Sequence, residues 1–105
     1  METFNSDADI NIISKMASVV VVDIFTQWCS PCRAMSVILD EMEKEFAGKV
    51  KFCKVDVSAG PPQWISDMKI SSVPTILFIK DGEIKKIETG FKDRQKLSVV
   101  LDDLV

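Results

Sequence analysis

The sequence of 105 residues contains no histidine and only three cysteines. Structural zinc and iron–sulfur sites are ordinarily held by four cysteine or histidine ligands, so one chain lacks the ligands for such a site, and only a metal shared by two chains would satisfy the count. Three cysteines also do not make the paired disulfide framework of a small secreted domain. The sequence therefore predicts no metal site and points to redox chemistry for its thiols.

The chain has no basic cluster and no long apolar run. Its formal net charge is −3 and its isoelectric point is about 4.9, which argues against a nucleic-acid partner. No apolar segment approaches the roughly 20 residues of a membrane-spanning helix, and the first residues lack the basic segment of a secretion signal. We therefore expect a cytoplasmic protein that binds neither nucleic acid nor membrane.

Glycine and proline are scarce, with four of each, and no repeat, low-complexity segment or linker is visible. A hydrophobic content of 47% is ample for one core in a chain of this length. We expect a single domain over residues 1–105 that functions as a monomer.

Two of the three cysteines, Cys29 and Cys32, lie three residues apart between an apolar run and an amphipathic one. Positions i and i+3 share one face of a helix at a separation that suits a disulfide. Pro31 fits the first helical position, which places Cys29 at the helix N-terminus, where the helix dipole and the nearby charge of Arg33 favour a thiolate. The spacing predicts an attacking thiol at Cys29 and a more shielded resolving thiol at Cys32.

Apolar periodicity predicts the elements around this pair. An amphipathic helix should run from the cysteine pair to a C-cap at Gly48, and a short helix is expected near Gln63 to Met68. A last helix should begin after a cap at Asp93, and an early helix after Ser6 or Asp7 should end before Ser18. Strands are expected at Val19 to Phe25, Val50 to Val57, Thr75 to Ile79 and Glu83 to Thr89, with a short one at Thr3 to Asn5.

This order of elements predicts an α/β fold with a central mixed sheet of four or five strands and helices on both faces. In open sheets of this kind ligands bind beyond the carboxyl ends of the strands, and the turn that carries Cys29 follows such an end. Cys53 lies within a predicted strand, where a buried structural thiol is the favoured interpretation and regulatory oxidation the alternative.

Several ordered motifs are spread over nearly the whole chain. The central one is Trp28-Cys29-Ser30-Pro31-Cys32, and the others are residues 22–25, 54–57, 73–75, 80–83 and Gly90. Together these motifs resemble those of the thioredoxin family, although most members carry glycine where this chain has Ser30. The resemblance implies the thioredoxin fold and a dithiol that opens and closes as a disulfide.

The resemblance also implies roles for individual residues. Cys29 would be the nucleophile and Cys32 the resolving thiol, with Ser30 and Pro31 between them as supporting residues. A cis peptide bond before Pro74 would present the Val73 backbone to an extended substrate. The apolar docking rim would consist of Trp28, Val73, Pro74 and Gly90.

Asp23 and Lys54 match the buried carboxylate of the family and its lysine neighbour. A carboxylate in an apolar strand should have a raised pKa, which would suit Asp23 to exchange the Cys32 proton. The alternatives are a strand-end aspartate that points to water for Asp23 and a plain surface lysine for Lys54. Trp28 has a packing role as its alternative.

The resemblance implies a protein-disulfide reductase whose substrates are disulfide-containing proteins. Such a protein binds no cofactor itself and receives electrons from NADPH through a flavoenzyme like thioredoxin reductase. Because Pro31 rather than histidine precedes Cys32, the oxidising and isomerase types are disfavoured. The alternative function is a thioredoxin-like adaptor that recruits a partner and whose thiols are incidental.

Overall fold

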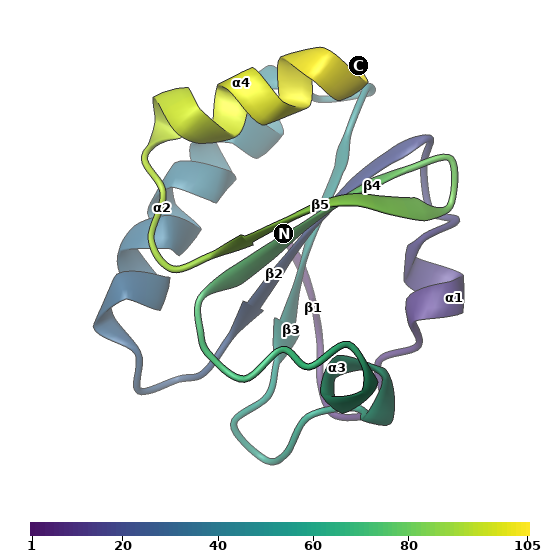
Figure 1. Cartoon of the computed structure of the whole chain (residues 1–105). Helices are drawn as coiled ribbons and strands as arrows, with labels where there is room; N and C mark the ends of the chain where they lie inside the picture. Colours follow the sequence, from purple (N-terminus) through teal and green to yellow (C-terminus); the bar gives the residue numbers. More distant parts are fainter.

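The structure, a computed structural model, describes all residues from 1 to 105 and centres on one five-stranded sheet (Figure 1). The strand order is β1-β3-β2-β4-β5, with β1–β3 and β2–β3 parallel and β2–β4 and β4–β5 antiparallel. The mixed sheet and the α/β class are therefore confirmed. The strands are β1 (Glu2–Phe4), β2 (Val19–Phe25), β3 (Lys51–Asp56), β4 (Thr75–Lys80) and β5 (Glu83–Thr89).

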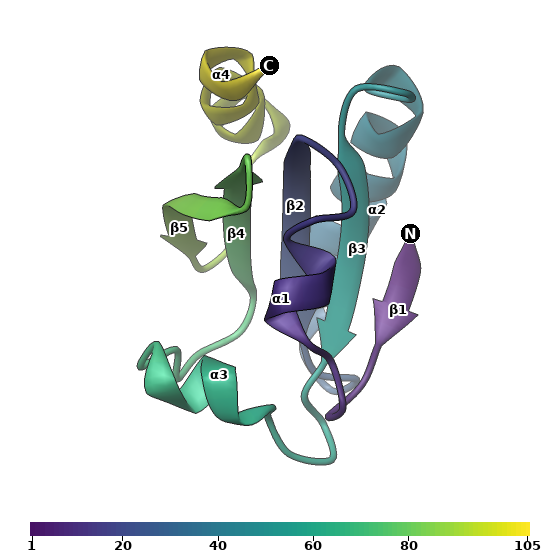
Figure 2. The ribbon, with the colours of Figure 1, turned by 90° about the vertical axis from the view of Figure 1, so that its right-hand side faces the viewer.

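Helices cover both faces of the sheet, as the element order predicts. The long helices α2 and α4 lie on one face, and the short helices α1 and α3 lie toward the other (Figures 1 and 2). None of them combines the length and the apolar composition that crossing a membrane requires. Their bounds are α1 (Ile10–Ile13), α2 (Ser30–Glu45), α3 (Gln63–Asp67) and α4 (Arg94–Leu104).

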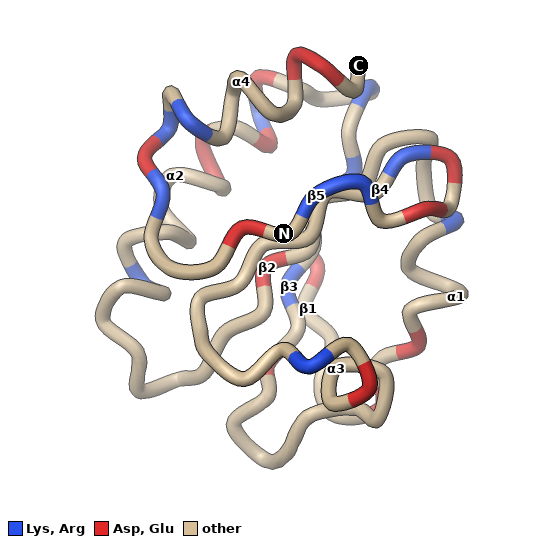
Figure 3. The backbone as a smooth tube through the Cα atoms, viewed as in Figure 1, with Lys and Arg blue, Asp and Glu red and all other residues tan.

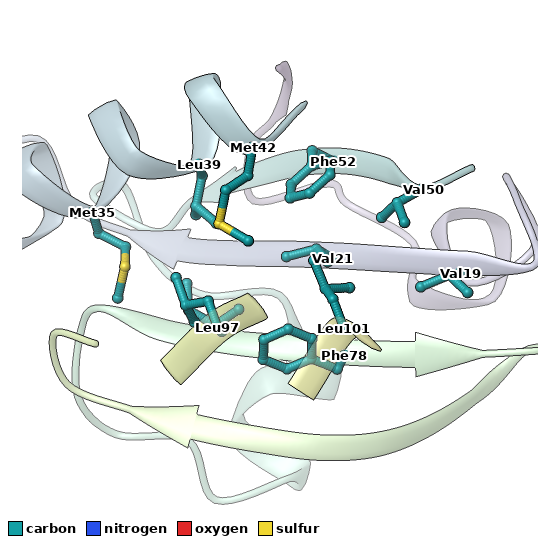
Figure 4. Packing of buried hydrophobic residues seen from close by; sticks show 11 residues of the cluster. Val19, Val21, Met35, Leu39, Met42, Val50, Phe52, Phe78, Leu97 and Leu101 are labelled. Carbon is teal, nitrogen blue, oxygen red and sulfur yellow. The ribbon is translucent and has the colours of Figure 1, made fainter. Parts of the chain in front are cut away.

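The central strand β2 explains why residues 19–25 read as one apolar run. Val19 and Val21 point into the core under α2 and α4, shown in Figure 4, whereas Val20, Val22 and Ile24 point into the core on the opposite face. A strand with packed layers on both sides needs apolar residues at every position. Asp23 is the one polar residue in this strand, and it is buried as well.

Two helix boundaries differ from the predicted ones. Asp9, rather than Ser6 or Asp7, caps α1 by accepting a hydrogen bond from the backbone N–H of Asn11. Helix α1 is a single turn, and tighter turns follow it up to Met16. Helix α2 ends at a cap on Phe46 rather than at Gly48. Gly48 instead supplies a positive φ of +82° in the turn that leads to β3.

The hairpin between β4 and β5 forms where the sequence predicts it. Asp81 and Gly82 both have positive φ values, +51° and +82°. Asn, Asp and Gly are the residues that tolerate this backbone conformation, which suits the twist of a two-residue hairpin turn. The hairpin places Gly90, at the end of β5, next to the loop before β4, since the Gly90 N–H donates to the Pro74 carbonyl at 2.8 Å.

Candidate active site

The cysteine pair lies in the turn between β2 and α2, beyond the carboxyl end of the parallel pair β2–β3 (Figure 1). Cys29 and Cys32 form a disulfide with their Cα atoms 5.1 Å apart. Cys29 is partly exposed, whereas Cys32 is 2% exposed. One sulfur is therefore accessible and the other is shielded, in the order that the sequence predicts.

Cys29 is the N-cap of α2. Its backbone is extended, and its Sγ accepts a hydrogen bond from the Cys32 N–H at 3.1 Å. An anion at this position interacts favourably with the free N–H groups and the positive end of the helix dipole. The helix begins at Ser30, so Pro31 occupies its second position rather than the predicted first, where its missing N–H is equally harmless.

Side chains around the turn fix its conformation. The Arg33 guanidinium donates to the Ser30 hydroxyl at 2.8 Å and to the Gln27 carbonyl at 3.5 Å. On the other side, the Gln27 N–H donates to the Ser58 hydroxyl at 2.9 Å, and the Gln27 side-chain amide donates to Asp56 at 2.8 Å. The turn is therefore held both to α2 and to the loop that follows β3.

Gln27, Asp56 and Ser58 were not predicted as site residues. Ser58 also donates its N–H to Asp56 at 2.9 Å. Although desolvation works in the opposite direction, hydrogen bonds from Gln27 and Ser58 hold the pKa of Asp56 below its ordinary value. Gln27 and Ser58 lie 31 residues apart in the chain, so no local pattern could have linked them.

A second loop, residues 70–74, leads into β4, which pairs with β2, the strand that precedes the cysteine turn. The Val73–Pro74 peptide bond is cis, as the resemblance implies. Trp28, next to the cysteines, is 77% exposed, which excludes the alternative of a buried packing role. Neither residues 24–32 nor residues 70–79 include a charged side chain, and both segments are tan in Figure 3.

An apolar groove of about 330 Å³ runs beside Val73. It lies between the end of β2 and α3, and its lining includes Ile24, Val57, Ile65, Ile70 and Val73. A groove of this composition can hold the side chains of an extended peptide while its backbone lies along the loop.

Asp23, on the strand that leads to the cysteine turn, is fully buried, and neither of its carboxylate oxygens has a hydrogen-bond partner. Burial raises the pKa of Asp23 from its ordinary value of 3.8 to about 7, with a smaller opposite effect from Lys54 and a small further rise from Asp40. The predicted direction of the shift is confirmed, and the alternative of a carboxylate that points to water is wrong. Near neutral pH this carboxyl group can either hold or accept a proton.

Lys54 pairs with Asp23 in the register of β2 and β3. Its ammonium group donates to the Ser36 hydroxyl on α2 at 2.8 Å and lies 4.5 Å from the centre of the Phe25 ring. Lys54 also lines a cavity of about 310 Å³ that includes Cys32 and Arg33. The lysine is thus a half-buried part of the site rather than a plain surface residue.

The third cysteine, Cys53, lies on β3 and is fully buried and unpaired. Burial raises the pKa of the Cys53 thiol to about 12. Because the thiolate is the reactive form, this thiol is inert in the folded protein. The structural interpretation of Cys53 therefore fits the structure better than regulatory oxidation.

An accessible sulfur at a helix N-terminus, a shielded sulfur one turn later and a sheet that positions both are the features of a thiol–disulfide oxidoreductase. The chain belongs to the thioredoxin family, because the family model described as Thioredoxin matches residues 2–103.

Individual relatives agree with the family assignment. Thioredoxin C-2 of Corynebacterium nephridii is 39% identical over 83 residues, which are 79% of this chain and 76% of the relative. Thioredoxin of Bacillus subtilis is 32% identical over 84 residues, or 80% of each chain. The chloroplastic Thioredoxin M-type of Triticum aestivum is 35% identical over 95 residues, which are 90% of this chain and 54% of the relative. This chain spans about half the length of that chloroplastic relative.

Among solved structures, a variant thioredoxin from Halobacterium salinarum NRC-1 is similar to this chain with a TM-score of 0.83. The match covers 98% of this chain and 90% of that one at 20% sequence identity. This similarity shows that the chain has the thioredoxin fold.

Proposed function

We propose that the chain reduces disulfide bonds in protein substrates through its Cys29–Cys32 pair. The observation that carries the proposal is the asymmetry of the pair, with Cys29 accessible at a helix N-terminus and Cys32 nearly inaccessible behind it. In the reduced protein the Cys29 thiolate attacks one sulfur of the substrate disulfide. A mixed disulfide forms, and the other substrate sulfur leaves as a thiolate.

Cys32 completes the reaction. Its thiol loses a proton, its sulfur attacks the Cys29 sulfur of the mixed disulfide, and the second substrate sulfur is released as a thiolate. Two electrons pass from the dithiol to the substrate, and the Cys29–Cys32 disulfide remains. We assign Asp23 as the group that accepts the Cys32 proton, since a carboxyl group that titrates near pH 7 is matched to this task.

Substrate docking is assigned to the uncharged surface around Cys29. The loop with the cis Val73–Pro74 bond offers backbone groups to an extended peptide, and Gly90 is bonded to Pro74 beside it. Trp28, next to Cys29 in the chain, provides an exposed aromatic surface. We assign substrate contact to Trp28, Val73, Pro74 and Gly90 on these grounds.

The oxidised pair has to be reduced again for a second turnover. Family membership supports a flavoenzyme of the thioredoxin-reductase type, supplied by NADPH, as the electron donor. On this proposal the chain carries electrons from the reductase to substrate proteins as a monomer. It does so in a reducing compartment, which we propose is the cytoplasm.

The reduction of insulin disulfides by dithiothreitol tests the proposal. We expect the wild type to accelerate the reaction and both Cys29→Ser and Cys32→Ser to lose turnover. Only Cys32→Ser should accumulate a covalent complex with a substrate, because its attacking thiol is intact and its resolving thiol is missing. The Cys53→Ser variant is the matched control and should remain active.

Two results would contradict the assignment. If Cys29→Ser reduced insulin as fast as the wild type, Cys29 would not be the nucleophile. If the wild type showed no reductase activity while Cys29→Ser and Cys32→Ser still bound a stoichiometric partner in a pull-down, the chain would be an adaptor. Its thiols would then have no part in its function.

A further inference from the structure

The structure contains a second buried carboxylate, Glu88, which the proposed mechanism does not use. Glu88 lies on β5 and is 8% exposed, and its Oε1 atom is buried without a hydrogen-bond partner. Lys86 on the same strand supplies a counter-charge at 3.7 Å from that oxygen. A carboxylate that is buried with one half-exposed ion-pair partner is costly to stability, which raises the question of what it does.

The strand registers place Glu88 in one row with Asp23. Asp23 on β2 pairs with Ile76 on β4, and Ile76 pairs with Glu88 on β5. The register shift between β4 and β5 lies further along, between Phe78 and Ile79, so it does not disturb this row. Residues that pair directly across strands point to the same face of a sheet, so both carboxylates lie on the face that α2 and α4 cover.

The row also fixes the separation of the two carboxylates. Neighbouring strands lie about 4.8 Å apart, so the backbones that carry Asp23 and Glu88 are roughly 10 Å apart. Ile76, which is fully buried, fills the position between them. A buried aliphatic residue leaves no room for water that would screen one charge from the other.

Other charged groups reach this region from the neighbouring elements. The charge of Lys54 on β3 lowers the pKa of Asp23, and the charge of Asp40 on α2 raises it. Lys86 forms an ion pair with Glu88. In the loop after β5, Lys92 donates to the Thr89 carbonyl at 2.7 Å. From α4 the buried residues Leu97 and Leu101 face the sheet, while Arg94 is paired with Glu41 and Glu45 of α2.

We propose that Glu88 is a positioning residue whose negative charge strengthens the hold of Asp23 on its proton. This proposal rests on the proposed function for its kinetic consequence, because Asp23 matters to catalysis only if it exchanges the Cys32 proton. A unit charge roughly 10 Å from Asp23, at an effective dielectric constant of about 20, shifts the Asp23 midpoint by about one pH unit. Lys86 acts on Asp23 with the opposite sign, so Glu88 and Lys86 together shift the Asp23 midpoint by less than Glu88 does alone.

The test is the titration of the Asp23 carboxyl carbon, followed by NMR in the full chain. In Glu88→Gln, which keeps Lys86, the Asp23 midpoint should fall by up to about one pH unit relative to wild type. The control is Glu83→Gln. Glu83 lies on the same strand and its side chain is 74% exposed, so the Asp23 midpoint should stay unchanged in this variant. An unchanged midpoint in Glu88→Gln would overturn the proposal.

A second variant keeps the test decisive if Glu88→Gln does not fold. Lys86→Gln removes the counter-charge of Glu88, so the Asp23 midpoint should rise instead of falling. A midpoint that stays the same or falls in Lys86→Gln would overturn the proposal.

The kinetic arm separates this proposal from the proposed function. The midpoint of the pH–rate profile for insulin reduction should move with the NMR midpoint in Glu88→Gln. In an Asp23→Asn background, Glu88→Gln should leave the profile unchanged, since the group on which it acts is gone. If the NMR midpoint moves but the rate profile does not, the coupling between Glu88 and Asp23 stands and the catalytic role of Asp23 fails.

Discussion

Asp23 and Lys54 are paired in the register of β2 and β3, yet the Lys54 ammonium donates to Ser36 and both Asp23 oxygens lack a hydrogen-bond partner. The lysine thus acts on the aspartate through its charge alone. The charge of Lys54 therefore offsets only part of the cost of burying the Asp23 carboxylate. Burial has the larger effect and raises the pKa of Asp23 to about 7. The ionised form of Asp23 therefore destabilises the fold, and the strand that leads to the cysteine turn carries a group that titrates near neutral pH.

The first prediction concerns stability. In the unfolded chain Asp23 titrates at its ordinary value of 3.8, and in the folded protein it titrates at about 7. Between these values the folded state binds more protons, so the contribution of Asp23 to stability is complete below about pH 4 and is lost as the pH rises through 7. A shift of this size corresponds to a loss on the order of 4 kcal/mol at high pH.

Asp23→Asn should therefore stabilise the protein at pH 8.5, by up to about 4 kcal/mol, and change its stability little near pH 4. Urea unfolding at the two pH values measures the difference. The exposed Asp102→Asn serves as the control and should show no such pH dependence. A stability gain that is equal at both pH values would contradict the titration of Asp23.

The second prediction isolates the charge of Lys54. Lys54→Met keeps much of the apolar stem and removes the ammonium group, whose charge lowers the pKa of Asp23. The Asp23 midpoint should rise above the wild-type value by roughly half to one pH unit, as measured by NMR. In Lys51→Met, on the same strand but paired with Glu2 at 3.0 Å, the midpoint should not change.

Much of the fold could be predicted from the sequence because its strongest elements are locally consistent. The run from Val19 to Phe25 is apolar at every position except Asp23, and the structure gives the same bounds for β2. The cap at Asp93 and the turn at Asp81 and Gly82 are single-residue signals, and both are confirmed. Where several residues could serve as a cap, as at the start of α1, the chosen one depends on tertiary contacts and was predicted wrongly.

The parts of the site that could not be predicted depend on contacts between distant segments. Lys54 and Ser36 are 18 residues apart, so the anchor of the lysine is visible only once α2 lies on β3. The row that links Asp23 to Glu88 requires the registers of β2, β4 and β5. Sequence patterns indicate that these strands exist but do not fix how far each is displaced along its neighbour.

The third prediction tests the docking surface. Because Trp28 is 77% exposed, Trp28→Ala should change the free energy of unfolding by less than about 0.5 kcal/mol. The KM for insulin should rise about tenfold, since an aromatic anchor typically contributes 1–2 kcal/mol or more to binding. The rate with a small disulfide such as 2-hydroxyethyl disulfide should change little, because such a substrate has few atoms that the tryptophan ring could contact.

The control for Trp28 is Ile12→Ala, which shortens a side chain on α1 that is 61% exposed. It should leave both substrates unaffected. If Trp28→Ala slowed the small disulfide and insulin equally, the tryptophan would act on the reactivity of the cysteines rather than on docking.

The fourth prediction separates the stability of the scaffold from the chemistry of the site. The Asp93 side chain caps α4 by accepting a hydrogen bond from the Lys96 N–H at 2.9 Å, and α4 buries Leu97 and Leu101 against the sheet. Asp93→Ala should lower the free energy of unfolding by about 1 kcal/mol, as measured by urea. Asp103→Ala, near the other end of the same helix, removes an exposed carboxylate that caps nothing and should have a smaller effect.

Insulin reduction by Asp93→Ala at 25 °C should match the wild type, because the cap lies outside the cysteine turn and the loss leaves the folded state dominant. The midpoint of Asp23 should also be unchanged. If Asp93→Ala lost activity while it remained folded, the start of α4 would belong to the docking surface. Asp93 would then be a site residue as well as a helix cap.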